Sequence, residues 1–165
     1  LIVDQEGLDE ARAFVAARRQ AMPQLNQQLI MLEAQLLVDR SEPPVVLAFL
    51  DAAVDRDPSN IALLYYRGMV GQQFGRLDIL ERDLTQVLTL HPEHADAMNS
   101  LGYTLADQTD RYDEALALIE RALAIRPDEP AFIDSMGWVL FKLGRLDEAL
   151  IQLERAYELF SNDER

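Results

Sequence analysis

The amino-acid sequence predicts an all-α protein made of repeated pairs of helices. Prolines recur every 34 or 35 residues along the chain, at Pro23, Pro58, Pro92 and Pro127. Between them the apolar residues follow the three- and four-residue spacing of a helix, as in Leu116, Ile119 and Leu123, and no segment alternates with the two-residue period of a strand. A fixed period of this length indicates an α-solenoid, in which each repeat packs on the next.

The turns between the helices follow from the Pro and Gly positions. Pro58, Pro92 and Pro127 close short turns, each with a candidate capping residue just after it. Gly75 and Gly144 lie seven residues after another glycine and can end the first helix of a pair. We therefore expect one leading helix and four pairs, over residues 7–21, then 25–39 and 44–56, 60–74 and 77–90, 94–107 and 112–125, and 130–143 and 147–160.

The third and fourth pairs repeat one pattern of large and small residues. The third carries Met98, Leu101, Gly102, Leu105, Tyr112, Ala115, Ile119, Ala122 and Pro127. The fourth carries Ile133, Met136, Gly137, Leu140, Gly144, Leu146, Ala149, Leu153 and Ala156. This pattern resembles the tetratricopeptide repeat (TPR) family. The resemblance implies a right-handed superhelix in a single array over residues 1–165, with a leftover second helix at 7–23 and repeats at 27–58, 61–92, 95–127 and 130–161.

Small residues in this pattern indicate where helices approach closely. Gly102 and Gly137 are expected to let the first helix of a pair lie against the second. The second pair departs from the pattern, since it has Gly71 in place of a large residue and Leu80 and Val87 in place of alanines. We expect looser or differently angled packing around this pair.

Charge and hydropathy exclude several classes of partner. Acidic residues outnumber basic ones by 29 to 15, which gives a net charge of −14, and there is no cysteine. Nucleic acids and anionic membranes attract clusters of Lys and Arg, whereas Lys142 is the only lysine here. No apolar run reaches the roughly 20 residues that cross a bilayer, so direct membrane insertion is not expected. Because the chain begins at Leu1 without Met, we expect a piece of a longer protein.

The first helix of each pair lines the inner surface of a solenoid, so binding residues are expected there. Side chains three or four residues apart and off the packing face form a stripe on each of these helices. Met69, Tyr103 and Trp138 share one repeat position and are expected to form a ladder, and aromatic side chains are enriched at binding hot spots. The groove is expected to contain Met31, Tyr65, Met69, Gln72, Gln73, Asn99, Tyr103, Asp134, Trp138, Phe141 and Lys142.

Two interpretations of this stripe stay open. Apolar stripes on helices more often belong to a core, so the aromatic residues are equally suited to pack on a neighbouring repeat. Polar neighbours such as Gln72, Asn99 and Asp134 favour a partly wet groove for a protein or peptide, either extended or helical. TPR co-chaperones hold a chaperone's C-terminal carboxylate with several Lys, Arg and Asn side chains. Only Asn99 and Lys142 suit that role here, among acidic neighbours, so it is disfavoured.

No catalytic site, metal site or cofactor is predicted. His91 and His94 have no obvious third ligand near them in the sequence. The segment from Asp55 begins like a calcium loop, but Asn60 and Tyr66 stand where the loop needs Gly and Glu. No nucleophile elbow or glycine-rich phosphate loop is present in the sequence. A non-enzymatic scaffold is therefore expected.

Two segments, Ala97–Tyr103 and Asp134–Leu140, carry a closer resemblance. They are similar to the C-terminal repeats of proteobacterial outer-membrane TPR lipoproteins, and in particular of adaptors for a periplasmic carboxyl-terminal processing protease. This resemblance implies a scaffold on the periplasmic side of the outer membrane that helps to deliver cell-wall hydrolases to the protease. It also implies a signal peptide, a lipid-bearing cysteine and further repeats upstream.

Two other functions stay open. One is an assembly scaffold for pilus or outer-membrane components that uses the same groove. The other is self-association, since an uncapped repeat end tends to be sticky. A homodimer would then form through apolar residues of the C-terminal helix, namely Ile151, Tyr157, Leu159 and Phe160.

Overall fold

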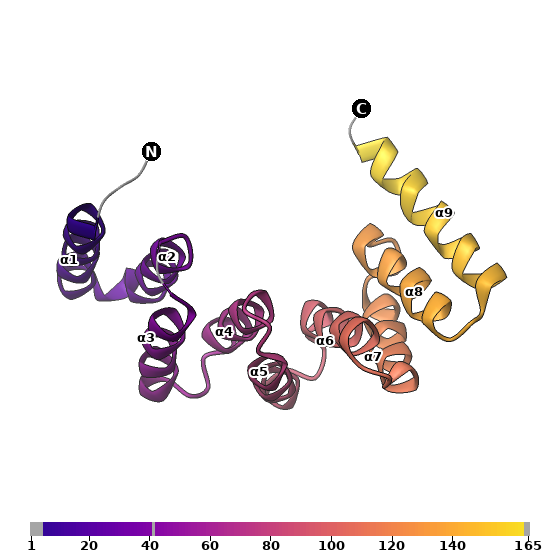
Figure 1. Ribbon diagram of the computed structural model, residues 1–165, viewed down its shortest axis with the longest axis horizontal. Coiled ribbons are helices and arrows are strands. Elements are labelled where there is room, and N and C mark those ends of the chain that lie inside the picture. The colour runs from indigo at the N-terminus through magenta and orange to yellow at the C-terminus, as the bar shows by residue number, and fades with distance from the viewer. Residues whose placement is uncertain (1–4, 41, 164–165) are drawn as a thin grey trace. The chain divides into compact units, whose positions relative to one another are not determined.

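The computed structural model describes residues 5–40 and 42–163 of the chain (Figure 1). Within these ranges the regular structure is helical and no strand occurs, which confirms the all-α prediction. The α-helices are α1 (Gln5–Ala21), α2 (Asn26–Val38), α3 (Pro43–Arg56), α4 (Ile61–Gln73), α5 (Leu77–Leu90), α6 (Ala95–Gln108), α7 (Tyr112–Ile125), α8 (Pro130–Lys142) and α9 (Leu146–Asp163). A short 3-10 helix, η1 (Pro23–Leu25), precedes α2 and was not expected from the sequence. Each expected helix is present, and only the start of α1 and the end of α9 differ by more than one residue.

Local side chains and glycines set the helix ends. The Asn60 side chain accepts a hydrogen bond from a backbone N–H in the first turn of α4, and His94 Nδ1 does the same for α6. Gly75 and Gly144 have φ angles of 69° and 77°, a left-handed conformation that ends α4 and α8. Pro43 begins α3, where its missing N–H costs no helical hydrogen bond.

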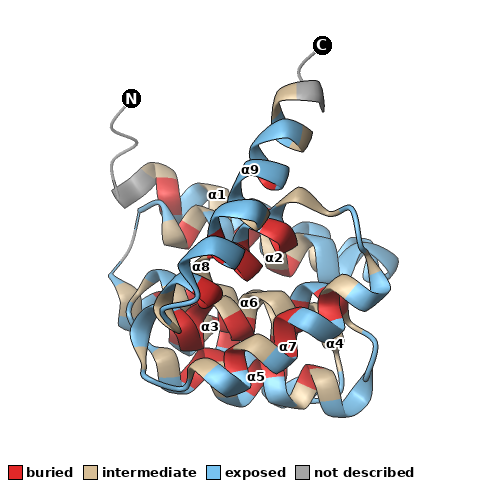
Figure 2. Ribbon diagram, turned by 90° about the vertical axis from the view of Figure 1, so that its right-hand side faces the viewer, coloured by how far each residue is buried: buried red, intermediate tan, exposed pale blue. Residues whose placement is uncertain are grey.

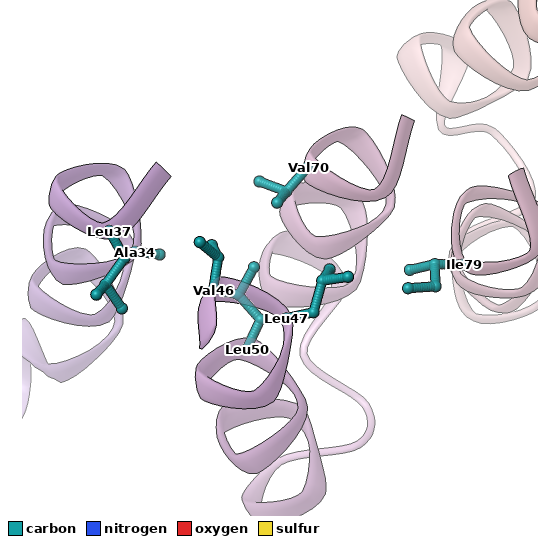
Figure 3. Close-up of a cluster of buried hydrophobic side chains, with 7 residues drawn as sticks. All are labelled: Ala34, Leu37, Val46, Leu47, Leu50, Val70 and Ile79. Atoms are coloured by element: carbon teal, nitrogen blue, oxygen red, sulfur yellow. The ribbon is translucent and has the colours of Figure 1, made fainter. Parts of the chain in front are cut away.

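The chain divides into two compact units, residues 1–83 and 84–165, with α5 beginning in the first and ending in the second. The core of the first unit brings together side chains of α2, α3, α4 and the start of α5 (Figure 3), namely Ala34, Leu37, Val46, Leu47, Leu50, Val70 and Ile79. The second unit buries Leu84, Val87, Met98, Leu105, Ile119, Ile133 and Val139 completely or almost completely. Figure 2 shows that much of the surface of α9 is exposed.

The close approach predicted at Gly102 and Gly137 is confirmed. A Cβ atom at Gly102 would lie 2.9 Å from the Ala115 carbonyl oxygen and 2.9 Å from Ile119 Cγ1. A Cβ atom at Gly137 would lie 2.6 Å from Leu153 Cγ. Both distances are shorter than real Cβ contacts, so a side chain at either position would force a neighbour to shift, and these glycines bring α6 onto α7 and α8 onto α9.

The looser packing expected around the second pair is not found where α4 meets α5. A Cβ atom at Gly71 would lie 2.9 Å from Ile79 Cβ, as close an approach as in the third pair. Leu80 and Val87 are both fully buried. The missing side chain at Gly71 makes room for Ile79, so α4 and α5 approach closely in this pair as well.

Candidate protein-binding groove

In the second unit, predicted groove residues come from two neighbouring first helices. Asn99 and Tyr103 lie one turn apart on α6, and Asp134 and Trp138 lie one turn apart on α8, which contacts α6. A spacing of four residues places each pair on one face of its helix. The structure therefore brings these four side chains onto adjacent helices, as the sequence predicts.

An aromatic platform ends this stripe on α8. The rings of Trp138 and Phe141 are stacked, with centroids 5.6 Å apart and planes inclined by 26°. Lys142 Nζ lies 5.3 Å from the centre of the Trp138 ring and 5.9 Å from that of Tyr112, within the range of a cation–π interaction. Phe141 is 50% exposed, so the platform presents apolar surface to the solvent.

Two polar atoms of the stripe are buried without a hydrogen-bond partner among the described residues. They are Asn99 Oδ1, an acceptor, and Trp138 Nε1–H, a donor. Buried polar atoms are almost always hydrogen-bonded, so two such atoms on one stripe are unusual. Together they match the N–H and C=O groups of a peptide backbone.

Tyr103 lies in an acidic environment. Its side chain is partly buried, and this burial raises the pKa of its phenol above the usual value. The negative charges of Asp107 and Asp134 raise this pKa further. Tyr103 therefore keeps its proton at neutral pH, and the surrounding carboxylates favour neutral or basic ligands.

The remaining predicted residues lie in the first unit. Met31 is on α2, while Tyr65, Met69 and Gln72 are on α4, and all four are partly exposed. Gln73, at the end of α4, is exposed. The role of these five residues in a groove stays a prediction, as does the ladder from Met69 to Tyr103.

The sequence analysis missed a buried ion-pair cluster in the first unit. Arg67 on α4 donates two hydrogen bonds to Asp83 on α5, with lengths of 2.6 and 2.8 Å, and one of 2.8 Å to Asp51 on α3. Burial lowers the pKa of Arg67, but the hydrogen bonds and charges of Asp83 and Asp51 outweigh it and raise the pKa overall. Arg67 thus stays charged and links three helices.

A second cluster occupies the equivalent place one repeat earlier. Glu33 on α2 is buried and pairs with Arg12 and Arg19 on α1, at 3.2 and 3.1 Å. Glu33 and Arg67 are 34 residues apart, and the same repeat position holds Leu101 in the third pair. A charge at a position that is apolar in a later repeat was the signal that could have revealed both clusters.

The two histidines have a structural role in the turn before α6. The ring of His94, which caps α6, meets the ring of His91 edge-on at a centroid distance of 5.8 Å. Across the described parts of the chain, no group of three or more His, Cys, Asp or Glu side chains is placed to hold a metal ion. No helix in those parts is both long and apolar enough to span a membrane.

Comparison with known proteins decides the family. Models of the tetratricopeptide repeat match residues 81–130 and 108–165. A TPR repeat-containing protein of Pseudomonas aeruginosa is 35% identical over 157 residues, which cover 95% of this chain. The chain belongs to the tetratricopeptide repeat family. This TPR chain spans about a quarter of the relative's length, since the match covers 27% of that protein.

Solved structures agree on the TPR fold. MamA is 21% identical and superposes with a TM-score of 0.76 over 97% of this chain and 92% of its own. YrrB, described as a TPR protein with an unusual peptide-binding site, is 18% identical, with a TM-score of 0.72 over 93% of this chain and 78% of its own. These similarities support a protein-interaction scaffold, and no enzyme family is indicated.

Proposed function

We propose that this TPR chain is the protein-binding part of a lipid-anchored periplasmic adaptor, which presents cell-wall hydrolases to a carboxyl-terminal processing protease. The resemblance of Ala97–Tyr103 and Asp134–Leu140 to adaptor lipoproteins supports this role. The 35% identical relative from Pseudomonas aeruginosa, a TPR repeat-containing protein, supports the scaffold part of this role. The adaptor itself performs no chemistry in this proposal.

The observation that carries the proposal is the stripe on α6 and α8 in the second unit. It combines an exposed, stacked aromatic platform with a buried acceptor on Asn99 and a buried donor on Trp138. A peptide laid along the stripe would cover the exposed ring of Phe141, and a shift of the side chains above the two buried atoms would let its backbone pair with them. Rigid aromatic surface with a few placed polar groups is typical of protein-binding hot spots.

A degradation assay with purified components tests the adaptor role. The processing protease and one cell-wall hydrolase are incubated with and without the chain, and the initial rate of hydrolase loss is measured. We expect the chain to raise this rate several-fold, and a Tyr103→Ala/Phe141→Ala variant to remove most of the increase. Phe14→Ala, which alters an exposed aromatic residue on α1, is the matched control and should behave as the unaltered chain.

The outcomes separate the scaffold from the adaptor. Binding of the hydrolase without faster degradation would contradict the adaptor role and favour an assembly scaffold. Equal acceleration by the unaltered chain and the Tyr103→Ala/Phe141→Ala variant would show that the stripe is not the contact surface. Circular dichroism of each variant establishes that the helices are retained.

A further inference from the structure

Two hollows of similar size lie between successive second helices of the second unit. The first is bordered by α5 and α7 and has a volume of about 430 Å³. The second is bordered by α7 and α9 and has a volume of about 440 Å³. We call them the α5–α7 hollow and the α7–α9 hollow. The α5–α7 hollow combines three apolar residues, Leu88, Leu101 and Leu118, with polar residues that include Thr85, Glu114 and Arg121.

The α5–α7 hollow lies on the opposite side of α6 from the proposed groove. Leu101, which lines the hollow, is two residues from both Asn99 and Tyr103. At 100° per residue, a step of two residues places Leu101 about 200° around the helix from these groove residues. Helices that border the hollow have neighbours of this chain before and after them, so its formation does not depend on where the chain ends. The hollow is therefore a separate surface of the repeat array.

In the first unit the equivalent place is filled by the buried ion-pair cluster. The members of that cluster, Asp51, Arg67 and Asp83, hold one another by hydrogen bonds of 2.6 to 2.8 Å. Residues of the α5–α7 hollow follow them at the repeat distance of 34 or 35 residues, namely Thr85, Leu101 and Leu118. A threonine and two leucines thus replace two aspartates and an arginine. Without the long arginine side chain, the crevice stays open and its lining suits an apolar ligand group.

Arg121 gives the α5–α7 hollow an unneutralised positive charge. Its guanidinium donates a hydrogen bond of 3.3 Å to the Pro92 carbonyl, and within the described part of the chain it forms no ion pair. Glu114, the acidic residue of this hollow, accepts hydrogen bonds of 3.0 and 2.8 Å from Arg111. One positive charge therefore remains at this hollow, although the chain as a whole has a net charge of −14.

The α7–α9 hollow has the opposite charge balance. Arg155, the arginine at the equivalent repeat position, is paired with Asp128 at 2.7 Å. Arg145 and Glu148, which also line this hollow, are paired with each other at 2.6 Å. Glu120 lines it too and forms no ion pair with any described residue. The two hollows therefore match in volume and in having an apolar lining, but differ in the sign of the remaining charge.

We propose that the α5–α7 hollow docks a segment of a partner protein that carries a large apolar side chain with an acidic side chain beside it. The apolar side chain covers Leu88, Leu101 and Leu118, and the carboxylate pairs with Arg121. Burial of apolar surface supplies most of the affinity. The pairing of guanidinium and carboxylate supplies the choice of ligand, because such charge-assisted hydrogen bonds have a defined geometry. This docking site does not require the adaptor role.

Nuclear magnetic resonance of the full, isotope-labelled chain tests the proposal residue by residue. The probe is a capped peptide, Ser-Gly-Glu-Leu-Leu-Glu-Gly-Ser, called the Glu peptide. A Lys peptide has Lys in place of both Glu, and a Ser peptide has Ser in place of both Leu. Salt of about 0.15 M, with a Debye length of about 8 Å, screens the net charge of the chain. We expect saturable shifts of the Leu101, Ala117 and Leu118 amide signals with the Glu peptide, about fivefold weaker binding of the Lys peptide there, and no saturable shift with the Ser peptide.

Three variants separate the hollow from general attraction between charges. Arg121→Glu should reverse the preference at the hollow, so that the Lys peptide binds more tightly. Arg155→Glu makes the same change in net charge at the equivalent position of the α7–α9 hollow and should leave the preference unchanged. Ala117→Trp fills the α5–α7 hollow from an exposed position and should abolish binding of the Glu peptide. Circular dichroism checks that each variant keeps its helices.

Four results would overturn the proposal. One is the absence of saturable shifts at the α5–α7 hollow, and another is an equal affinity of the unaltered chain for the Glu and Lys peptides. A change of preference in Arg155→Glu as large as that in Arg121→Glu would show that only net charge matters. Shifts around Asn99 and Tyr103 in place of the hollow would assign the peptide to the groove. Failure of the hydrolase assay alone would leave this proposal standing, since it concerns a different surface.

Discussion

Replacing Gly102 by alanine tests the packing of the second unit more sharply than any larger change. The added methyl carbon would lie 2.9 Å from the carbonyl oxygen of Ala115 and 2.9 Å from Ile119 Cγ1. The first is backbone of α7 and the second belongs to a fully buried side chain, so neither can move without disturbing the core. Gly137 is the matched control, because its new methyl would meet only the side chain of Leu153 at under 3 Å.

The two substitutions are expected to differ in free energy of unfolding although both add one methyl group. Alanine in place of glycine within a helix gains about 1 kcal/mol. Overpacking a rigid site costs about 1 to 3 kcal/mol. Gly102→Ala should therefore lower stability by up to about 2 kcal/mol. Leu153 is 37% exposed and can rotate away, so Gly137→Ala should stay within about 1 kcal/mol of the unaltered chain.

Urea unfolding measures both variants in one experiment. Trp138 is the only tryptophan of the chain, so its fluorescence reports on the second unit, and circular dichroism follows all helices. Gly137→Leu, which no rotation of Leu153 can accommodate, should lower stability by about 3 kcal/mol. An increase in stability for Gly102→Ala, or a larger loss for Gly137→Ala than for Gly102→Ala, would refute this reading of the helix contacts.

Three other results are expected. Arg67→Met should lower the free energy of unfolding, by at most about 3 to 5 kcal/mol, because buried Asp83 loses the two hydrogen bonds from Arg67 and keeps only the one from Arg82. Arg67→Leu/Asp83→Leu should recover most of this loss in urea unfolding, and a harmless single change would contradict the ion-pair account. Gly144→Ala should cost about 1 kcal/mol, since alanine is strained at a φ of 77°, and an unchanged melting temperature would contradict it. Asp134→Asn should lower the pKa of Tyr103, because removing a nearby negative charge favours the phenolate. An ultraviolet absorbance titration measures this pKa, and an unshifted curve would show that Asp134 does not act on the phenol.

The helices and the close contacts at glycines could be predicted because the same residue pattern recurs in several repeats. Gly102 and Gly137 occupy one repeat position, and a small residue recurs where two helix axes must approach. The same repetition placed the aromatic residues of α6 and α8 on one face of neighbouring helices. A feature that recurs at a fixed spacing can be recognised even where most other residues differ between repeats.

The buried ion pairs could not be predicted in this way, because they break the repeat. From the sequence alone, Arg67 is interpreted as an exposed charged residue. In the structure its side chain instead binds both Asp51 and Asp83. Which of several acidic residues pairs with it depends on the rotation of three helices, and sequence spacing alone does not determine that. The close contact between Gly71 and Ile79 was missed for a similar reason, since the two residues meet from different helices.

Hydrogen–deuterium exchange of the chain with and without a purified cell-wall hydrolase tests the binding claim most directly. The account predicts slower exchange in α6 and α8, around Asn99, Tyr103 and Trp138, and loss of this protection in the Tyr103→Ala/Phe141→Ala variant. Because a bound hydrolase would cover the groove face of α6 and α8, protection should concentrate on these two helices. No change in exchange at α6 and α8, or protection confined to the outward surfaces of α7 and α9, would contradict the proposed groove.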